Sequence, residues 1–106
     1  MARHDPQLLK GVLSLLLLRL LREQEGYGYA LVVRLRGQGF DEVGEGSVYP
    51  ALTRMESHGL LAARLVPSRS GPARKYYRLT AAGTAELERA TEAWLDLVDT
   101  VAKALQ

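Results

Sequence analysis

The sequence predicts a mainly α fold with a small β-hairpin, an α+β winged helix-turn-helix with a long C-terminal dimerisation helix. Three observations predict it. Apolar residues recur at helical spacing in four segments. Two short segments of alternating residues flank a turn that contains glycine and proline. The C-terminal segment carries its apolar residues in one stripe, which is typical of a helix that packs against a partner.

Length and composition limit the possible classes of protein. The 106 residues are expected to form a winged helix-turn-helix domain at 1–79, with its first helix at 7–23, and a dimerisation helix at 80–106. No cysteine is present and the two histidines lack ligand spacing, so no metal and no cofactor are expected. The apolar run at 12–21 is about half the length that crosses a bilayer. Without a secretion signal, a cytoplasmic protein with no membrane contact is expected.

The first two predicted helices differ in character. The segment 7–23 has leucine on nearly every side, and a domain of this size cannot easily bury such a helix alone. A second copy of the chain is therefore expected to cover it. The glycines and tyrosines at 26–29 interrupt the pattern, and a second helix is expected from about Tyr27 to Arg36. Gly37 and Gly39 would end it.

The third helix is expected to begin near Ser47 as its N-cap, which leaves Pro50 in the first turn. Gly59 would stop the helix after His58. The residues expected to pack inward are spaced three or four apart: Val48, Ala51, Leu52 and Met55. Those expected to face outward are Ser47, Tyr49, Pro50, Thr53, Arg54 and Ser57.

A basic hairpin is expected to follow, with strands at Leu61–Pro67 and Ala73–Leu79 and a turn at 68–72. Between Leu60 and Leu79 there are five basic residues and no acidic residue, whereas acids predominate after Thr80. Such a hairpin suits a polyanion.

A polar helix beside a basic hairpin suits a DNA duplex, because the helix fits the major groove and the hairpin reaches the backbone. Arg54 is the long side chain able to contact guanine, and Thr53 or Ser47 would contact several bases. The alternative for Tyr49 and Tyr76 is packing, and for Arg54 an ion pair with Glu56 or Glu23. The candidate DNA-binding residues are Tyr29, Ser47, Tyr49, Pro50, Thr53, Arg54, Arg69, Arg74 and Lys75.

The last helix, with Thr80 as its N-cap, carries a heptad seam and would be about 38 Å long. A seam of that length needs a partner, so a homodimer is expected. Its two third helices would reach major grooves about 34 Å apart on an inverted-repeat operator. The predicted dimerisation residues are Leu87, Thr91, Trp94, Val98, Val101 and Leu105.

The segments Gly26–Tyr29, Ser47–Leu52, Gly59–Leu60 and Arg74–Thr80, together with Glu56, resemble the signature of the PadR family of transcriptional regulators. The resemblance covers nearly the whole chain, and the single C-terminal helix is similar to the smaller subgroup. It implies a homodimeric, usually repressing, DNA-binding protein that acts on nearby genes.

The resemblance also implies a role for Trp94, since multidrug-responsive relatives stack flat aromatic compounds on a tryptophan of this helix. The pocket would be lined by Leu9, Val12, Leu16, Trp94 and Val98. Because Val98 rather than an acid follows Trp94 on the seam, the expected effector is planar and apolar. The alternative is that Trp94 only packs in the dimer core.

The sequence is also compatible with two other functions. The chain would be a helical dimer that acts as a protein-interaction module, or a small-molecule-binding protein without specific DNA binding. An enzyme is not expected, because no nucleophile and base pair, metal spacing or phosphate loop is present.

Overall fold

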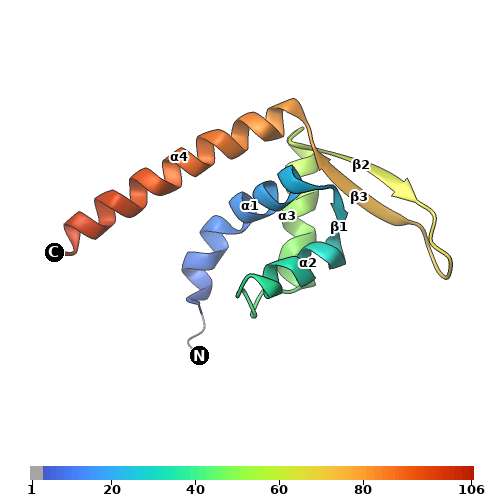
Figure 1. Ribbon diagram of the computed structural model, residues 1–106, viewed down its shortest axis with the longest axis horizontal. Helices are drawn as coiled ribbons and strands as arrows, with labels where there is room; N and C mark the ends of the chain where they lie inside the picture. The colour runs from blue at the N-terminus through green and yellow to red at the C-terminus, as the bar shows by residue number, and fades with distance from the viewer. Residues whose placement is uncertain (1–3) are drawn as a thin grey trace.

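The computed structural model describes residues 4–106, which form four helices and a three-stranded antiparallel sheet of order β1-β3-β2. The elements are α1 (Pro6–Glu23), β1 (Gly26–Tyr27), α2 (Gly28–Gly37), α3 (Glu45–Ser57), β2 (Leu61–Val66), β3 (Arg74–Leu79) and α4 (Ala81–Ala104). The helices α1, α2 and α3 form the body of the protein, from which α4 and the β2–β3 hairpin extend on opposite sides (Figure 1). The predicted winged helix-turn-helix fold is confirmed.

Helix α1 supplies much of the core. Asp5 caps it by accepting hydrogen bonds from the backbone N–H groups of Gln7 and Leu8, with Pro6 in the first turn. Its C-terminal half is buried against α2, α3, β3 and α4. The buried residues of α1 are Leu13, Leu17, Leu18, Leu20 and Leu21. Despite this leucine content, no helix within residues 4–106 is long and apolar enough to span a membrane.

The sheet has one strand more than the predicted hairpin. Gly26 and Tyr27, expected to break the chain and open the second helix, instead pair with Tyr77 and Tyr76 of β3. Gly26 is buried, and a Cβ atom there would make an ordinary contact, 3.6 Å from the Leu31 side chain. Helix α2 therefore begins at Gly28, after the strand.

Helix α3 begins earlier than predicted. Its N-cap is Gly44, not Ser47, because the Gly44 carbonyl already accepts from the N–H groups of Ser47 and Val48. Buried Val43 anchors the preceding loop, and its carbonyl accepts from the Arg36 Nε at 2.9 Å. Pro50 consequently lies in the second turn, where it has no N–H to donate to the Gly46 carbonyl. The predicted stop at Gly59 is confirmed by its φ of 78°.

The hairpin strands are each one residue shorter than predicted, since Pro67 and Ala73 lie outside β2 and β3. Gly71 adopts a φ of 108° in the connecting turn, a conformation that glycine tolerates best. The Ser68 hydroxyl lies 3.2 Å from the Gly71 carbonyl and 3.0 Å from the Pro72 carbonyl and donates to this pair. The Ser68 side chain thus stabilises the turn at the hairpin tip.

Thr80 joins the sheet to α4, as predicted for its N-cap. Its hydroxyl donates to the Gly59 carbonyl at 2.7 Å and accepts from the Gly83 N–H at 3.0 Å. Only the first turns of α4 reach the core, where Leu87 is 2 % exposed. The rest projects outward, so the radius of gyration is 15.0 Å, against about 13 Å for a compact chain of this length.

Gly83 is predicted to be required where α4 meets the end of α3. A Cβ atom at Gly83 would lie 2.1 Å from the backbone oxygen of Leu60, which cannot move away as a flexible side chain could. Gly83→Ala should therefore lower the free energy of unfolding by about 1–3 kcal/mol, measured by urea denaturation.

Gly11→Ala is the matched control, because a Cβ atom at Gly11 in α1 would meet nothing within 4 Å. It should raise the free energy of unfolding by about 0.5–1 kcal/mol through helix propensity alone. Both proteins are compared at one protein concentration, since an oligomer's stability depends on it. Equal effects of the two substitutions would contradict the close approach at Gly83.

Candidate nucleic-acid interface

Helix α3 separates its apolar and polar residues as the sequence predicts. Val48, Ala51, Leu52 and Met55 are all buried. The residues predicted to face outward are all exposed: Ser47, Tyr49, Pro50, Thr53, Arg54 and Ser57. At 100° per residue, Pro50, Thr53 and Ser57 lie opposite the buried stripe. Tyr49 lies on one flank of this surface, and Ser47 and Arg54 lie on the other.

Tyr49 lies across the start of α2. A Cβ atom at Gly28 would come within 2.3 Å of Cε1 in the Tyr49 ring, so glycine makes room for the ring. Burial raises the pKa of the Tyr49 hydroxyl, and the carboxylate of Glu45 adds to this, while the backbone of Tyr29 acts in the opposite direction. Tyr49 nevertheless remains 40 % exposed. Tyr49 therefore packs against Gly28, as the packing alternative predicted, and still presents an exposed surface that a ligand can contact.

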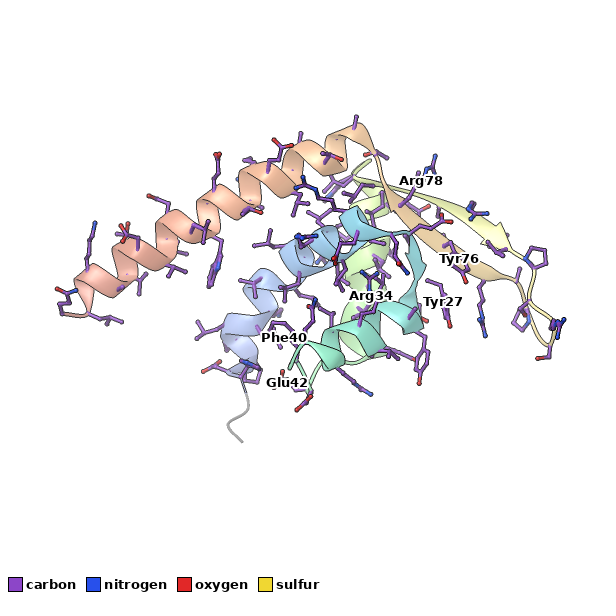
Figure 2. All side chains as sticks on the ribbon, in the orientation of Figure 1. Tyr27, Arg34, Phe40, Glu42, Tyr76 and Arg78 are labelled. Carbon is purple, nitrogen blue, oxygen red and sulfur yellow. The ribbon has the colours of Figure 1, made fainter. Side chains whose placement is uncertain are left out.

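The sheet holds a cluster of aromatic and basic side chains beside α2 (Figure 2). The rings of Tyr27 and Tyr76 lie 5.2 Å apart, and the Arg74 guanidinium lies 4.7 Å from the centre of the Tyr27 ring. Arg64 forms an ion pair with Glu25, and its hydrogen bond holds the pKa of that carboxyl below its usual value. Arg74 is thus placed by an aromatic ring, and within residues 4–106 it has no carboxylate partner.

Lys75 has a carboxylate partner on the third helix. Its Nζ lies 2.8 Å from Oε1 of Glu56, and this hydrogen bond is the largest cause of the raised pKa of Lys75. The pair joins β3 to α3. The alternative considered for Arg54, a pair with Glu56 or Glu23, is absent from residues 4–106: Glu56 pairs with Lys75, and Glu23 lies beside Arg19 and Arg34.

The remaining candidates lie at the two ends of this surface. Arg69 is exposed at the hairpin tip, where a hollow of about 290 Å³ includes Arg69, Arg74 and Tyr76 in its lining. Tyr29 is exposed in the first turn of α2, next to Gly28 and the Tyr49 ring. The candidates of α2, α3 and the hairpin therefore form an interrupted surface rather than one enclosed site.

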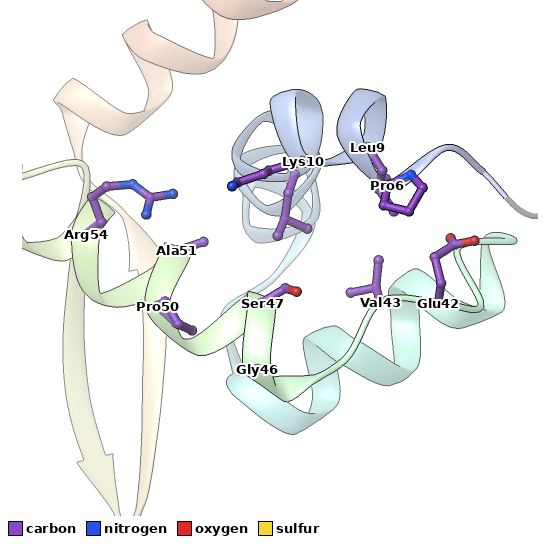
Figure 3. A pocket seen from close by; sticks show the side chains of 11 residues that line it. Pro6, Leu9, Lys10, Glu42, Val43, Gly46, Ser47, Pro50, Ala51 and Arg54 are labelled. Carbon is purple, nitrogen blue, oxygen red and sulfur yellow. The ribbon is translucent and has the colours of Figure 1, made fainter.

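A groove of about 520 Å³ separates the N-terminal half of α1 from α3. Ser47, Pro50 and Arg54 line its α3 side, and Lys10 faces them from α1 (Figure 3). Sequence reasoning did not single out Lys10. The spacing within α1 shows that it is polar, but only the tertiary packing of α1 on α3 brings it to this groove.

A second hollow, of about 460 Å³, lies between α1 and α4. Four of the five residues predicted for an effector pocket line it, namely Leu9, Val12, Leu16 and Trp94. Val98 is not part of this lining, which instead includes Phe40, Leu8 and Leu15. The surface is formed within a single chain, and Trp94 remains 42 % exposed beside it.

The far part of α4 exposes the predicted seam. Trp94, Val98, Val101 and Leu105 are large apolar side chains in contact with solvent, and Leu105 is 80 % exposed. The Thr91 hydroxyl, on the same seam, donates to the Leu87 carbonyl at 2.7 Å. Its hydrogen-bonding need is therefore met within the helix, which lowers the free-energy penalty of covering it.

The ionisable side chains of the described residues lie mainly in surface contacts. No group of three histidine, cysteine, aspartate or glutamate side chains within residues 4–106 is placed to hold a metal ion. Two carboxylates with lowered pKa values, Glu25 and Glu86, pair with Arg64 and Arg89 on the surface. Burial acts to raise the pKa of Glu42, but hydrogen bonds from His4 outweigh this effect, so the pKa of Glu42 is also lowered. These shifts therefore reflect local ion pairs and hydrogen bonds.

Comparison with known proteins identifies the group of proteins to which this arrangement belongs. Residues 17–89 match the Transcriptional regulator PadR-like family. A PadR-like transcriptional regulator from Bacillus cereus is 42% identical, with 94% of this chain and 97% of that chain covered and a TM-score of 0.81. A PadR family transcriptional regulator from Eggerthella lenta is 40% identical, with coverages of 94% and 87% and a TM-score of 0.87.

A structure of Bacillus subtilis PadR in complex with operator DNA is also similar. It is 28% identical, covers 76% of this chain and 46% of that chain, and superposes with a TM-score of 0.69. The family match spans the C-terminal part of α1, the sheet, α2, α3 and the first turns of α4. This chain belongs to the PadR-like family of transcriptional regulators.

Proposed function

We propose that the protein is a homodimeric, sequence-specific DNA-binding repressor that acts on an inverted-repeat operator. The observation that carries the proposal is the polar surface of α3, with Pro50, Thr53 and Ser57 opposite a buried stripe, next to a basic hairpin. A helix of this kind fits the major groove with its polar residues toward the base edges. The similarity to Bacillus subtilis PadR, solved with operator DNA, supports the same use here.

The proposed contacts are of two kinds, to base edges and to the phosphate backbone. Arg54 has the length and donors for a bidentate contact to guanine, with Thr53 and Ser47 beside it. Tyr29 of α2, Tyr49 of α3, and Arg69 and Arg74 on the hairpin contact the phosphate backbone. Lys75 joins them when it leaves Glu56. Pro50 contributes shape rather than hydrogen bonds, because its ring has no N–H.

The exposed seam of α4 supports the proposed dimer. Isolated apolar side chains on a surface are ordinary, but a continuous stripe along a projecting helix favours an interaction surface. A second copy that pairs α4 with α1 and α4 of its partner would cover Trp94, Val98, Val101 and Leu105. The two-fold axis would place the two copies of α3 in successive major grooves, about 34 Å apart.

Substitutions on α3 and the hairpin should have different effects on DNA binding. Arg54→Ala should reduce the preference for the operator over random duplex by about 1–3 kcal/mol. Arg74→Ala should weaken binding to both duplexes equally and lower the slope of log affinity against log salt. Fluorescence anisotropy at several salt concentrations, with duplexes from the protein's own promoter, measures both.

The matched control is Arg89→Ala, since Arg89 pairs with Glu86 on α4, away from the proposed interface. It should leave both affinities unchanged. A wild-type protein that binds its own promoter no better than random duplex at physiological salt would rule out sequence-specific repression.

A charge on the α4 seam should separate the proposed dimer. Val98→Asp places a carboxylate on the exposed stripe, where its desolvation opposes pairing. Sedimentation equilibrium should then report a monomer. Thr100→Asp adds the same charge on the opposite side of α4 and should leave a dimer. A wild-type monomer at micromolar concentration would refute this part of the proposal.

The apolar hollow between α1 and α4 favours a small-molecule signal that releases the repressor from DNA. A flat aromatic compound would fit a surface lined by leucines and Trp94. Because Trp94 is the only tryptophan, its fluorescence reports on that hollow alone.

Planar aromatic compounds should quench Trp94 saturably and lower the operator affinity at the same concentrations. Leu16→Arg, which places a charge in the hollow, should abolish the quenching. Leu95→Arg is the control, because Leu95 is exposed on α4 but does not line the hollow. If no compound in a diverse panel quenches Trp94, its role is packing in the dimer.

A further inference from the structure

Two basic side chains face each other across the groove between α1 and α3. Figure 3 shows the Lys10 ammonium and the Arg54 guanidinium pointing toward one another from opposite sides. Within residues 4–106, neither side chain belongs to an ion pair. The only acid in the lining is Glu42, at the other end of the groove, and it binds the backbone and ring of His4.

The arrangement favours an anion between the two cations. Like charges that point at each other repel, and an anion placed between them turns this repulsion into two attractive interactions. Arg54 offers a fork of N–H donors, Lys10 offers three more, and the Ser47 hydroxyl lines the same groove. A phosphate suits such donors, since it accepts several charge-assisted hydrogen bonds at once.

The position of the groove identifies the source of the phosphate. It runs along the flank of the α3 surface that carries Pro50 and Thr53. When a helix lies in the major groove, the sugar-phosphate strands that border this groove run along the flanks of the helix. A strand on this flank would bring a backbone phosphate between α3 and α1, while the base edges lie against the centre of α3.

We propose that Lys10 of α1 is a DNA-contacting residue, and that Lys10 and Arg54 hold one backbone phosphate between them in this groove. The inference rests on the proposed DNA binding and extends its interface from α2, α3 and the hairpin to α1. Arg54 has donors enough to contact the phosphate and an adjacent base. Lys10 then positions the strand that Arg54 reads.

The test compares Lys10→Gln with Lys103→Gln, which removes the same charge from the far end of α4. Lys10→Gln should weaken binding several-fold and by equal factors on operator and random duplex, because a phosphate contact carries no sequence information. The salt slope should fall by about 0.9 for each protomer bound. Lys10→Arg, which keeps the charge, should restore most of the affinity.

A double-mutant cycle tests whether the two side chains share one phosphate. The losses caused by Lys10→Gln and Arg54→Gln should not add in the double variant, because each substitution removes part of the same contact. Circular dichroism and sedimentation verify that every variant keeps the fold and the oligomeric state of the wild type. Fully additive losses would exclude a shared phosphate.

The outcomes separate this inference from the proposed function. If Lys10→Gln matches Lys103→Gln in affinity and salt slope, the contact by Lys10 is refuted, whatever the operator preference of the wild type. If the wild type shows no operator preference, specific repression fails, and the salt slope on random duplex still decides the role of Lys10.

Discussion

The burial of α1 is the constraint on which the other elements depend. Most leucines of its C-terminal half are buried, and α2, α3, β3 and α4 all pack against α1. Each buried leucine stabilises the fold by about 1.5–3 kcal/mol, so the five buried in α1 together match the net stability of a typical domain. The elements that carry the candidate interface and the α4 seam therefore all pack on α1. A displacement of α1 would move both the interface and the seam.

The sequence predicts those features that depend on the residue pattern within a single helix or strand. A leucine-rich run predicted α1, and the spacing of Val48, Ala51, Leu52 and Met55 predicted which side of α3 is buried. The alternation from Arg74 to Leu79 predicted β3. These patterns are local because each residue's environment follows from its position on its own helix or strand. The exposed and buried sides of α3 could therefore be predicted without knowing which elements pack against it.

The features that sequence reasoning missed depend on contacts between elements. A two-residue strand such as Gly26–Tyr27 is too short to show alternation, and β3 alone determines its register. The start of α3 follows from Val43, whose burial fixes the preceding loop. In the sequence, Lys10 cannot be distinguished from an ordinary solvated lysine, because only the packing of α1 against α3 places it in the groove. The ion pair that occupies Lys75 likewise joins residues from two elements.

That ion pair limits how the hairpin binds a polyanion. Lys75 is already neutralised by Glu56, so a phosphate must compete with a carboxylate at 2.8 Å before it gains this cation. Exposed ion pairs are weak, about 0–1 kcal/mol, and the exchange is therefore readily reversible. Arg74, placed over the Tyr27 ring, has no such competitor among residues 4–106. Neighbouring basic residues of one strand thus differ in how available their charges are.

Thr80 gives α4 the mechanical character of a lever. The helix is fixed at one end, where the Thr80 hydroxyl bonds to Gly59 and Gly83 and where Gly83 lies against the Leu60 backbone. Its 24 residues extend about 36 Å from that fulcrum. A rotation of about 5° there would displace the far end by about 3 Å, as follows from this length. In a dimer joined through α4, an angular change too small to disturb the core would therefore alter the distance between the two DNA-facing surfaces.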